Sequence, residues 1–559
     1  MNVSASVSHT GNRYLQMAAV VSVVLLTLAA TVNYPGSKSL LLLFGVLAAA
    51  MTKAIFDCHG RFFTFFLFAF LTLGCWAKLV LHFLFDTKFI EPTGDFDHSA
   101  QAWDTALISL SIAFATLAAC HWITTSKRSP IDLASVPLPS NRLLFPALWA
   151  AATLSILLLA FNYRYSILKV GTEPTLQLSS YIYVIFSFMV AWGNFILLAT
   201  IGYWLVTQKK LQPETLFYIL ITEGALTAIS MGSRAQMILH VAVPFVICFT
   251  HISNSNWSFT HRQWVRVIGT TASMFVISIL LVSADRLQSF ALAKPVIPHN
   301  DFAASTITPK AVEIQVLSAD DGVLNELLSP QFFKITDAQP GFAAIQLPGL
   351  ILPAAMWESW KVEHETLPLP AIPPEIPLAA PPTESVATTR WKGMLRELSK
   401  LVVDRWVGLE GVLTVTSIEN RSFSLLKEAI REKPDKGTQA IYQRMSNAQY
   451  QDFENFTFMT IPGPIAILLY SGNNAILIAG LAFLFLAGIA TEQIAVRLVG
   501  NLFTQATVGV ALAYLLVQSN FPRVQFFFLI EIIGFLAGLY ILKTILDLRL
   551  AKPYGKLSC

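Results

Sequence analysis

The chain has 559 residues, of which 54% are hydrophobic and only 13% are charged, with a formal net charge of +4. Its mean hydropathy is +0.58. Charged residues make up about a quarter of an ordinary soluble domain, so this composition excludes that class. It predicts a membrane protein that crosses the bilayer many times, and no nucleic-acid partner is expected.

The apolar residues gather in long runs, which we interpret as helices. About 20 apolar helical residues span the roughly 30 Å of hydrocarbon, and irregular backbone facing lipid would leave its amides unpaired. We therefore expect an all-α polytopic membrane protein with about 12–14 transmembrane helices. The runs are 14–32, 38–56, 62–85, 104–125, 143–161, 179–206, 214–231, 236–252, 264–284, 457–471, 475–490, 498–517 and 524–543.

The apolar pattern is interrupted between residues 457 and 490. Pro462-Gly463-Pro464 and Ser471-Gly472-Asn473-Asn474 both fall there. Because Pro and Gly break helices, the pattern indicates broken or re-entrant helices in this region.

Lys and Arg collect in alternate loops, and short cytoplasmic loops are the ones that gather basic residues. We therefore place the acidic loop 86–104, the turn at Ser233-Arg234 and the long insertion on the outer face. Four helices after the insertion would put the basic C-terminal tail outside. We therefore expect the number of spans to be miscounted at one place, either in 457–490 or at an apolar piece of the insertion near 342–357. The basic loop residues are Lys53, Arg61, Lys127, Arg128, Arg142, Lys209, Lys210, Arg262 and Arg266.

The long insertion divides the chain into three parts. An N-terminal membrane domain of about nine helices covers 1–284, a large outer loop covers 285–455, and a C-terminal membrane domain of three to four helices with a short tail covers 456–559. The Pro-rich run 367–382 is typical of an extended linker. Helical spacing returns at 388–417 and 421–449, so we expect a compact, partly helical domain resting on the membrane.

Arg234 lies in Ser230-Met-Gly-Ser-Arg-Ala-Gln236, between two apolar runs near the outer interface. A guanidinium offers a rigid fork of donors that matches phosphate oxygens, and it stays charged at any relevant pH. Gly232 and Ser233 would let a phosphate approach the backbone. The alternative is an arginine that extends to lipid headgroups.

The segment Asp404-Arg405-Trp406-Val-Gly-Leu-Glu410 sets an acid, a base and an aromatic side by side. If it is helical, Trp406 and Glu410 share a face. Trp stacks on sugar rings, and Glu410 would take a proton from a hydroxyl. The alternative is an amphipathic interfacial helix with an internal ion pair.

Several ionisable residues lie inside apolar runs, among them Glu223, Lys78 and Glu531. A charge at that depth is costly unless it faces protein or water, so each is a functional candidate or the partner of another helix. His240 also lies in an apolar run, and the sequence shows no partner for it.

The chain shows no cofactor or metal motif. Neither a Walker A sequence nor a Gly-rich dinucleotide fingerprint is present. The five cysteines have no ligand-like spacing. Asp95 and Asp97 in the acidic loop are a weak metal site, and they are also suited to capping the following helix. We expect no cofactor and no metal.

Three segments carry a resemblance: Gly232-Ser-Arg-Ala-Gln-Met-Ile238, Asp404-Arg-Trp-Val-Gly-Leu-Glu-Gly411, and Phe456 to Ala466 with Tyr470-Ser-Gly472. Together with the many helices and the large outer loop, they resemble the O-antigen polymerase and ligase superfamily. They are more specifically similar to membrane proteins of the oligosaccharide repeat-unit polymerase type. Ligases rely on a His in the large loop, and neither His299 nor His364 stands in a matching motif, which favours polymerase over ligase.

The resemblance implies metal-independent glycosyl transfer from undecaprenyl pyrophosphate at the outer face of a bacterial inner membrane. Arg234 and Arg405 would bind the donor pyrophosphate and stabilise the leaving group, and Glu410 would activate the acceptor. Glu223 is a more distant candidate for that base, and Ser233, Trp406 and Glu223 would help to bind substrate. Implied partners are the lipid-linked oligosaccharide, membrane lipids, a chain-length regulator and a flippase.

Two alternative functions remain open. One is a membrane glycosyltransferase that takes sugar from a polyprenyl monophosphate, which would need Asp95 and Asp97 and a divalent ion. The other is a polysaccharide transporter or flippase, which would need charged residues along a central cavity.

Overall fold

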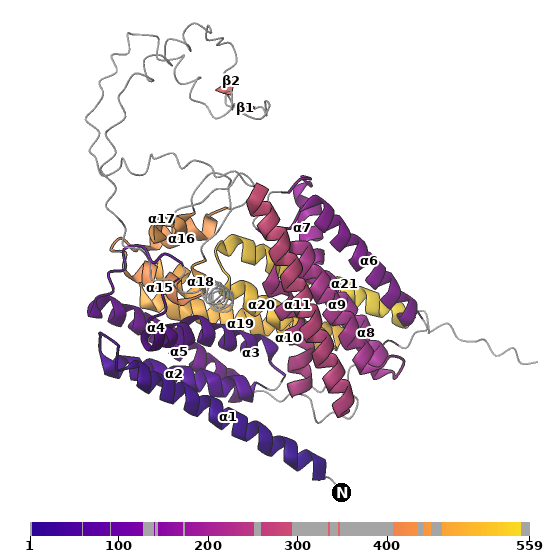
Figure 1. Ribbon diagram of the computed structural model, residues 1–559, viewed down its shortest axis with the longest axis horizontal. Helices are drawn as coiled ribbons and strands as arrows, with labels where there is room; N and C mark the ends of the chain where they lie inside the picture. The colour runs from indigo at the N-terminus through magenta and orange to yellow at the C-terminus, as the bar shows by residue number, and fades with distance from the viewer. Residues whose placement is uncertain are drawn as a thin grey trace, which may run out of the picture. The chain divides into compact units, whose positions relative to one another are not determined.

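A computed structural model covers the chain, and it describes residues 3–58, 60–89, 91–126, 139, 143–170, 174–250, 259–292, 334–335, 345–346, 406–433, 440–448 and 461–548. The described part is almost entirely helical (Figure 1). The chain divides into two compact units, residues 1–296 with 393–559, and residues 297–392. In the second unit only the short antiparallel pair of β1 (Lys334–Ile335) and β2 (Ile345–Gln346) is described.

Ten described helical segments are long and apolar enough to cross a bilayer, and two shorter apolar helices accompany them. The first half of the chain contains the following elements: α1 Val3–Ala30, α2 Lys38–Asp57, α3 Phe62–Leu71, η1 Thr72–Ala77, α4 Lys78–Phe85, α5 Ala100–Ser126, α6 Leu144–Tyr165, α7 Ser180–Phe188, η3 Met189–Gly193, α8 Asn194–Thr207, α9 Pro213–Met231, α10 Arg234–Thr250 and α11 His261–Leu292. The second half contains α15 Leu409–Thr416, α16 Phe423–Arg431, α17 Ile441–Ser446, α18 Gly463–Leu469, α19 Asn474–Val499, α20 Leu502–Val517 and α21 Pro522–Leu548. A multi-pass membrane protein is therefore confirmed.

Two of the long segments contain a π-helical turn. η1 connects α3 to α4, and η3 connects α7 to α8. A π turn adds a residue to the helical repeat and alters which carbonyls are paired within the helix, and such turns are frequent at functional sites. Both turns in this protein receive contacts from distant parts of the chain.

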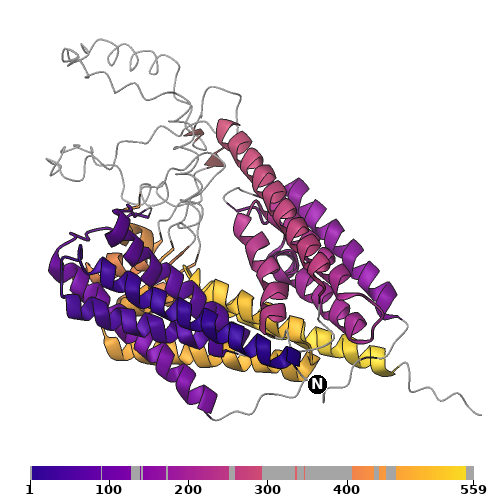
Figure 2. The same ribbon diagram turned by 60° about the horizontal axis from the view of Figure 1, so that its bottom comes forward.

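The apolar helices pack along their lengths because their buried faces carry large aromatic and branched side chains. α2 packs between α1 and α5, and α20 packs against α3, α8, α10 and α19. Figures 1 and 2 show α1, α2 and α5 side by side. The core contains fully buried side chains such as Phe44, Phe114 and Trp204.

The apolar run 457–471 does not form a spanning helix. Its helix, α18, has only seven residues, and at 1.5 Å per residue it extends over roughly 10 Å, far less than the hydrocarbon thickness. Pro462 immediately precedes it, and Ser471-Gly472-Asn473 separates it from α19. The expected break between 457 and 490 is therefore confirmed.

Three apolar helices follow the insertion. α19 and α21 are long enough to span a bilayer, and α20 is one of the two shorter apolar helices. At the far end of α19, Glu492 accepts hydrogen bonds from the backbone N–H of Phe62 and Phe63, beside the basic loop between α2 and α3. Lys543, near the end of α21, donates to the carbonyl of Val499 at that same end of α19. The described end of α21 thus lies on the side of the basic loops, in agreement with the charge of the tail.

The end of the insertion packs with the membrane helices. All eight residues of α15 are buried, and the helix contacts α5, α18 and η1. The outer loop between α4 and α5 joins the same region, since Gly94 N–H donates to Ser446 and Asn447 donates to Asp95. The expected compact, partly helical domain over 285–455 stays a prediction, because 293–333, 336–344, 347–405, 434–439 and 449–455 lie outside the described residues.

Candidate functional site at the turn between α9 and α10

A two-residue turn connects α9 and α10 and places Arg234 at the first position of α10. Gly232 ends α9 in the left-handed conformation with φ 60°, which is a frequent way for a helix to end because glycine has no Cβ to clash. Ser233 is buried and its N–H donates to the carbonyl of Ala228 at 2.9 Å. The turn is therefore tightly built, and Arg234 is partly buried.

A fully buried asparagine attaches the loop after α6 to this turn. The Asn162 side-chain amide donates to the carbonyl and the hydroxyl of Ser230 at 3.0 and 2.9 Å. Its oxygen accepts from the N–H of Leu168 at 2.7 Å. Val170 N–H then donates to the carbonyl of Met231 at 2.8 Å. These bonds fix the backbone on both sides of Lys169.

Lys169 lies over the turn as a result. A Cβ at Gly232 would come within 3.4 Å of Lys169 Cγ. The Lys169 ammonium forms an ion pair with Asp285 of α11, with Nζ and Oδ2 2.7 Å apart and the two side chains 11% and 25% exposed. The lysine is therefore held close to the turn that carries Arg234.

Lys169, Arg234 and Asp285 together carry two positive charges and one negative charge. The N-terminus of α10 adds a partial positive charge at the same place. Such an arrangement attracts anions, and phosphate oxygens above all. We refer to these three residues with Gly232 and Ser233 as the turn site.

Sequence reasoning identified Arg234 and Ser233 but missed Lys169 and Asp285. Lys169 lies between the runs 143–161 and 179–206, in a loop that the alternation of basic residues places on the same side as Arg234. This shared side of the membrane was the one sign in the sequence that Lys169 could lie near Arg234. The bonds of Asn162 that bring the loop onto the turn are not visible in sequence spacing.

Glu410, the predicted base, is buried elsewhere in the helical core. Its Oε1 lies 2.5 Å from Lys78 Nζ, and the two side chains are 2% and 6% exposed. A Cβ at Gly74 of η1 would lie 2.0 Å from the carbonyl oxygen of Val407, so only glycine permits this close approach. The predicted role of Glu410 as a base stays a prediction, and its carboxylate is paired in this structure.

The expectation that Trp406 and Glu410 share a helical face is wrong. α15 begins at Leu409, and Gly408 before it has φ 144°, a conformation that favours glycine and interrupts the helix. Trp406 therefore precedes the helix. Arg405 lies outside the described residues. The substrate-binding roles of Trp406 and Arg405 stay predictions.

The predicted residues at the turn and at α15 have different neighbours. The turn contacts the loop after α6 and the end of α11, whereas α15 contacts η1, α5, α17 and α18. Ser233 and Arg234 therefore have one set of neighbours, and Glu410, which pairs with Lys78, has another.

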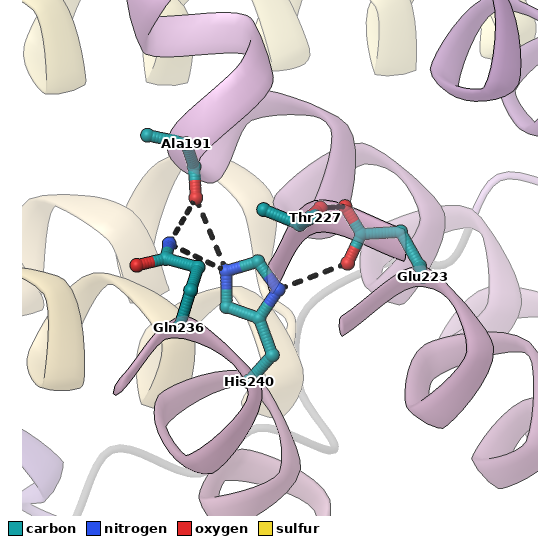
Figure 3. Close-up of polar contacts among 5 residues, drawn as sticks. All are labelled: Ala191, Glu223, Thr227, Gln236 and His240. Carbon is teal, nitrogen blue, oxygen red and sulfur yellow. Dashed lines mark hydrogen bonds and ion pairs between the residues drawn. The ribbon is translucent and has the colours of Figure 1, made fainter. Parts of the chain in front are cut away.

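Glu223, the remaining predicted residue, has a partner that the sequence did not reveal. Its carboxylate lies 3.0 Å from Nδ1 of His240 and accepts from Thr227 at 3.0 Å (Figure 3). Both of its oxygens are thus engaged by protein groups. Its predicted contribution to substrate binding or to acceptor activation stays a prediction.

The acidic loop 86–99 leads into α5, whose first turn is capped by Ser99, which accepts from the N–H of Ala102, and not by Asp95 or Asp97. Asp97 accepts from the N–H of Ser99 at 2.9 Å, just before α5 begins at Ala100, and this backbone hydrogen bond is the main cause that lowers the pKa of Asp97. Asp95 accepts from Asn447. Within the described ranges no group of three or more His, Cys, Asp or Glu side chains is arranged to hold a metal ion.

The fold and composition define an α-helical protein that crosses a membrane many times. No protein-family model, curated protein or solved structure matches the chain.

Proposed function

We propose that the protein joins oligosaccharide repeat units carried on undecaprenyl pyrophosphate into a surface polysaccharide, at the outer face of a bacterial inner membrane. The supporting observation is the turn site, where Lys169 is held against Gly232 beside Arg234. A pyrophosphate at the head of a lipid needs cations at the membrane surface, and two cations with a helix N-terminus meet that need.

The proposed reaction is a transfer at the anomeric carbon of the donor. The acceptor hydroxyl oxygen forms the new glycosidic bond while the bond from the anomeric carbon to the pyrophosphate oxygen breaks. The pyrophosphate leaves with the electron pair, and the hydroxyl proton passes to a base. Lys169 and Arg234 would stabilise the charge that develops on the leaving group.

Asp285 has a defined part in this proposal. It neutralises Lys169 before the donor binds, with Nζ and Oδ2 2.7 Å apart. A pyrophosphate would compete with this carboxylate for the ammonium and add Arg234 as a second partner. Glu410 is the base that the sequence suggests, and it would serve only when its pair with Lys78 is open.

The proposal is tested with single substitutions at the turn site. Arg234→Lys keeps the charge but loses the planar fork, and Lys169→Met removes a charge while keeping much of the volume. Membranes containing each full-length variant would be supplied with undecaprenyl-pyrophosphate-linked repeat units, and product length would be measured. We expect at least tenfold less polymer while the protein is still inserted in the membrane. Arg405→Lys tests Arg405, the other cation predicted to bind the donor pyrophosphate.

Arg266→Lys is the matched control, because Arg266 lies at the other end of α11, is 64% exposed and pairs with Glu214. It should leave polymer length unchanged. Normal product ladders in both Arg234→Lys and Lys169→Met would contradict the proposed site. Loss of activity on adding a chelator would instead favour an enzyme that uses polyprenyl monophosphate and a divalent ion.

A further inference from the structure

Three helical segments meet at a buried polar cluster (Figure 3). Glu223 comes from α9, Gln236 and His240 come from α10, and Ala191 comes from the π turn η3. Glu223, Gln236 and His240 are exposed by 4%, 3% and 0%. The steps of the proposed transfer use none of these groups, although Glu223 is also the more distant candidate base that the sequence suggests.

Each side of the His240 ring has a polar partner. Nδ1 lies 3.0 Å from Glu223 Oε2. Nε2 lies 3.0 Å from the Gln236 side-chain nitrogen and 3.1 Å from the Ala191 carbonyl oxygen. The Gln236 nitrogen also donates to that carbonyl at 2.6 Å. The Ala191 carbonyl oxygen is therefore within hydrogen-bond distance of both Gln236 and His240.

The rest of the ring is enclosed by aromatic groups. The centroids of Phe195 and Trp192 lie 4.3 and 5.4 Å from the centroid of His240. Because a buried charge is costly when nothing pairs with it, the protonation states available to His240 are those in which Glu223, Gln236 and Ala191 satisfy every donor and acceptor.

One such state holds fewer protons. Nδ1–H of a neutral His240 donates to the carboxylate of Glu223, which also accepts from Thr227. The two hydrogens of the Gln236 amide then go to Nε2 of His240 and to the carbonyl of Ala191. All partners are satisfied, and the cluster carries one negative charge.

A second state holds one more proton. Nε2–H of His240 now donates to the carbonyl of Ala191, at the same 3.1 Å. Another proton lies between Nδ1 and Glu223, either on the ring as an ion pair or on the carboxyl group as a neutral pair. The Gln236 amide no longer donates to the ring, and the cluster is neutral.

We propose that Glu223 and His240 form a binding site for one proton inside the membrane domain, and that uptake of this proton exchanges the hydrogen bond from Gln236 to His240 for one from His240 to Ala191. The proposal rests on these contacts and does not depend on the proposed function. Gln236 lies in the first turn of α10, two residues after Arg234, so proton occupancy is coupled to the turn that carries this arginine.

The charged groups on the neighbouring elements are the following. On α9, Glu214 lies near Arg266 of α11, and on α11 Asp285 holds Lys169. The first turn of α11 also carries His261 and Arg262, and Arg164 lies in the last turn of α6, which packs against α9. Arg234 begins α10, about 1.7 turns before His240 at 3.6 residues per turn. The segments α7, η3, α8 and α20 carry no Asp, Glu, Lys, Arg or His side chain.

The test is nuclear magnetic resonance of the full-length protein in lipid nanodiscs, with nitrogen-15 in its histidines, between about pH 5 and about pH 9. The His240 signals are assigned by their loss in His240→Asn. We expect Nε2 of His240 to pass from unprotonated to protonated in a single-proton step as the pH falls. In Glu223→Gln this step should differ from that of the original protein, because the carboxylate that faces Nδ1 is gone.

Glu214→Gln is the matched control on the same helix, and it should leave the His240 step unchanged. If His240→Asn does not accumulate, the signals are assigned with Gln236→Leu. This variant removes the hydrogen bond that Gln236 donates to the ring, so the Nε2 signal of His240 should shift at high pH only. Either of two results overturns the proposal: an Nε2 that keeps one protonation state over the whole range, or a step that is identical in Glu223→Gln.

Discussion

Lys78 and Glu410 lie 332 positions apart in the sequence and form an ion pair of 2.5 Å in which both side chains are almost completely buried. Lys78 is the first residue of α4, directly after the π turn η1, and Glu410 lies in the first turn of α15. The pair joins the end of the long insertion to the N-terminal helices.

Removing one partner of this pair should be strongly destabilising. Lys78→Met or Glu410→Leu leaves a buried charge without its partner, which costs about 3–5 kcal/mol, whereas an apolar replacement of both is close to neutral. We therefore expect each single variant to lower the free energy of unfolding markedly and the double variant to recover most of it. Thermal unfolding in detergent measures the three variants against the original protein.

The same double variant separates a structural role of Glu410 from a catalytic one. If Glu410 only pairs with Lys78, the stable double variant should still make polymer. If Glu410 accepts the hydroxyl proton, the double variant should be stable and inactive. A double variant destabilised by the sum of the two single effects would show that these residues are not energetically coupled.

Asn162 should control the position of Lys169. Asn162→Ala removes three hydrogen bonds made at Ser230 and Leu168, leaves buried groups unpaired and should cost about 1–3 kcal/mol. The loop that carries Lys169 would also be released from the turn, so we expect weaker binding of undecaprenyl pyrophosphate. Titration of the detergent-purified protein with this lipid measures the change.

Asn33→Ala is a suitable comparison, since the Asn33 amide makes one hydrogen bond of 2.7 Å to the carbonyl of Phe83, away from the turn site. It should leave lipid binding unchanged. Equal lipid binding by Asn162→Ala and the original protein would show that the loop attachment does not position Lys169.

The positions of the helices were predictable because polar groups that face lipid are costly. Spanning helices therefore consist of long apolar runs, which are visible in the sequence. The runs 38–56 and 214–231 correspond closely to Lys38–Asp57 and Pro213–Met231. The break at Pro462-Gly463 was also visible, because proline and glycine act locally. In each case the information lies within a few residues of the feature.

The side-chain partners were not predictable in this way. Glu223 and His240, like Lys78 and Glu410, come from separate helices, and a single sequence does not encode which helix faces which. The π turn that offers the Ala191 carbonyl has an ordinary apolar sequence, Met189 to Gly193. The interruption at Gly408 depends on tertiary contacts, because the backbone at Val407 reaches Gly74.

The three segments after the insertion predict the location of the C-terminal end. A reporter fused after Leu548 should lie on the same side as one placed in the loop between α8 and α9, and opposite to one placed after Gly472. Fusions to alkaline phosphatase and to a fluorescent protein measure this, because each is active on one side only. We expect the end of α21 to be cytoplasmic, as the positive loops indicate. An outer location for Leu548 with a cytoplasmic location for Gly472 would contradict the short α18.

The last prediction concerns the pH dependence of the helices at the end of the insertion. Glu432 follows α16, is partly buried and accepts from the N–H of Ile441 at 2.7 Å. Burial, with a smaller contribution from the negative charge of Glu428, raises the pKa of Glu432 above its usual value of 4.5. These causes outweigh the hydrogen bond from Ile441 and the positive charge of Arg444, which act in the opposite direction. The folded protein therefore holds this proton more tightly than the unfolded chain does.

It follows that the free energy of unfolding falls as the pH rises from 4.5 through the raised pKa of Glu432, because in this window the folded state binds more protons. Glu432→Gln keeps an oxygen that accepts from Ile441 but does not titrate, so its stability should depend less on pH there. Hydrogen exchange of α16 and α17 measures the effect. Glu419→Gln, at an exposed side chain in the loop before α16, should retain the original dependence, and an equal slope in Glu432→Gln would show that another group is responsible.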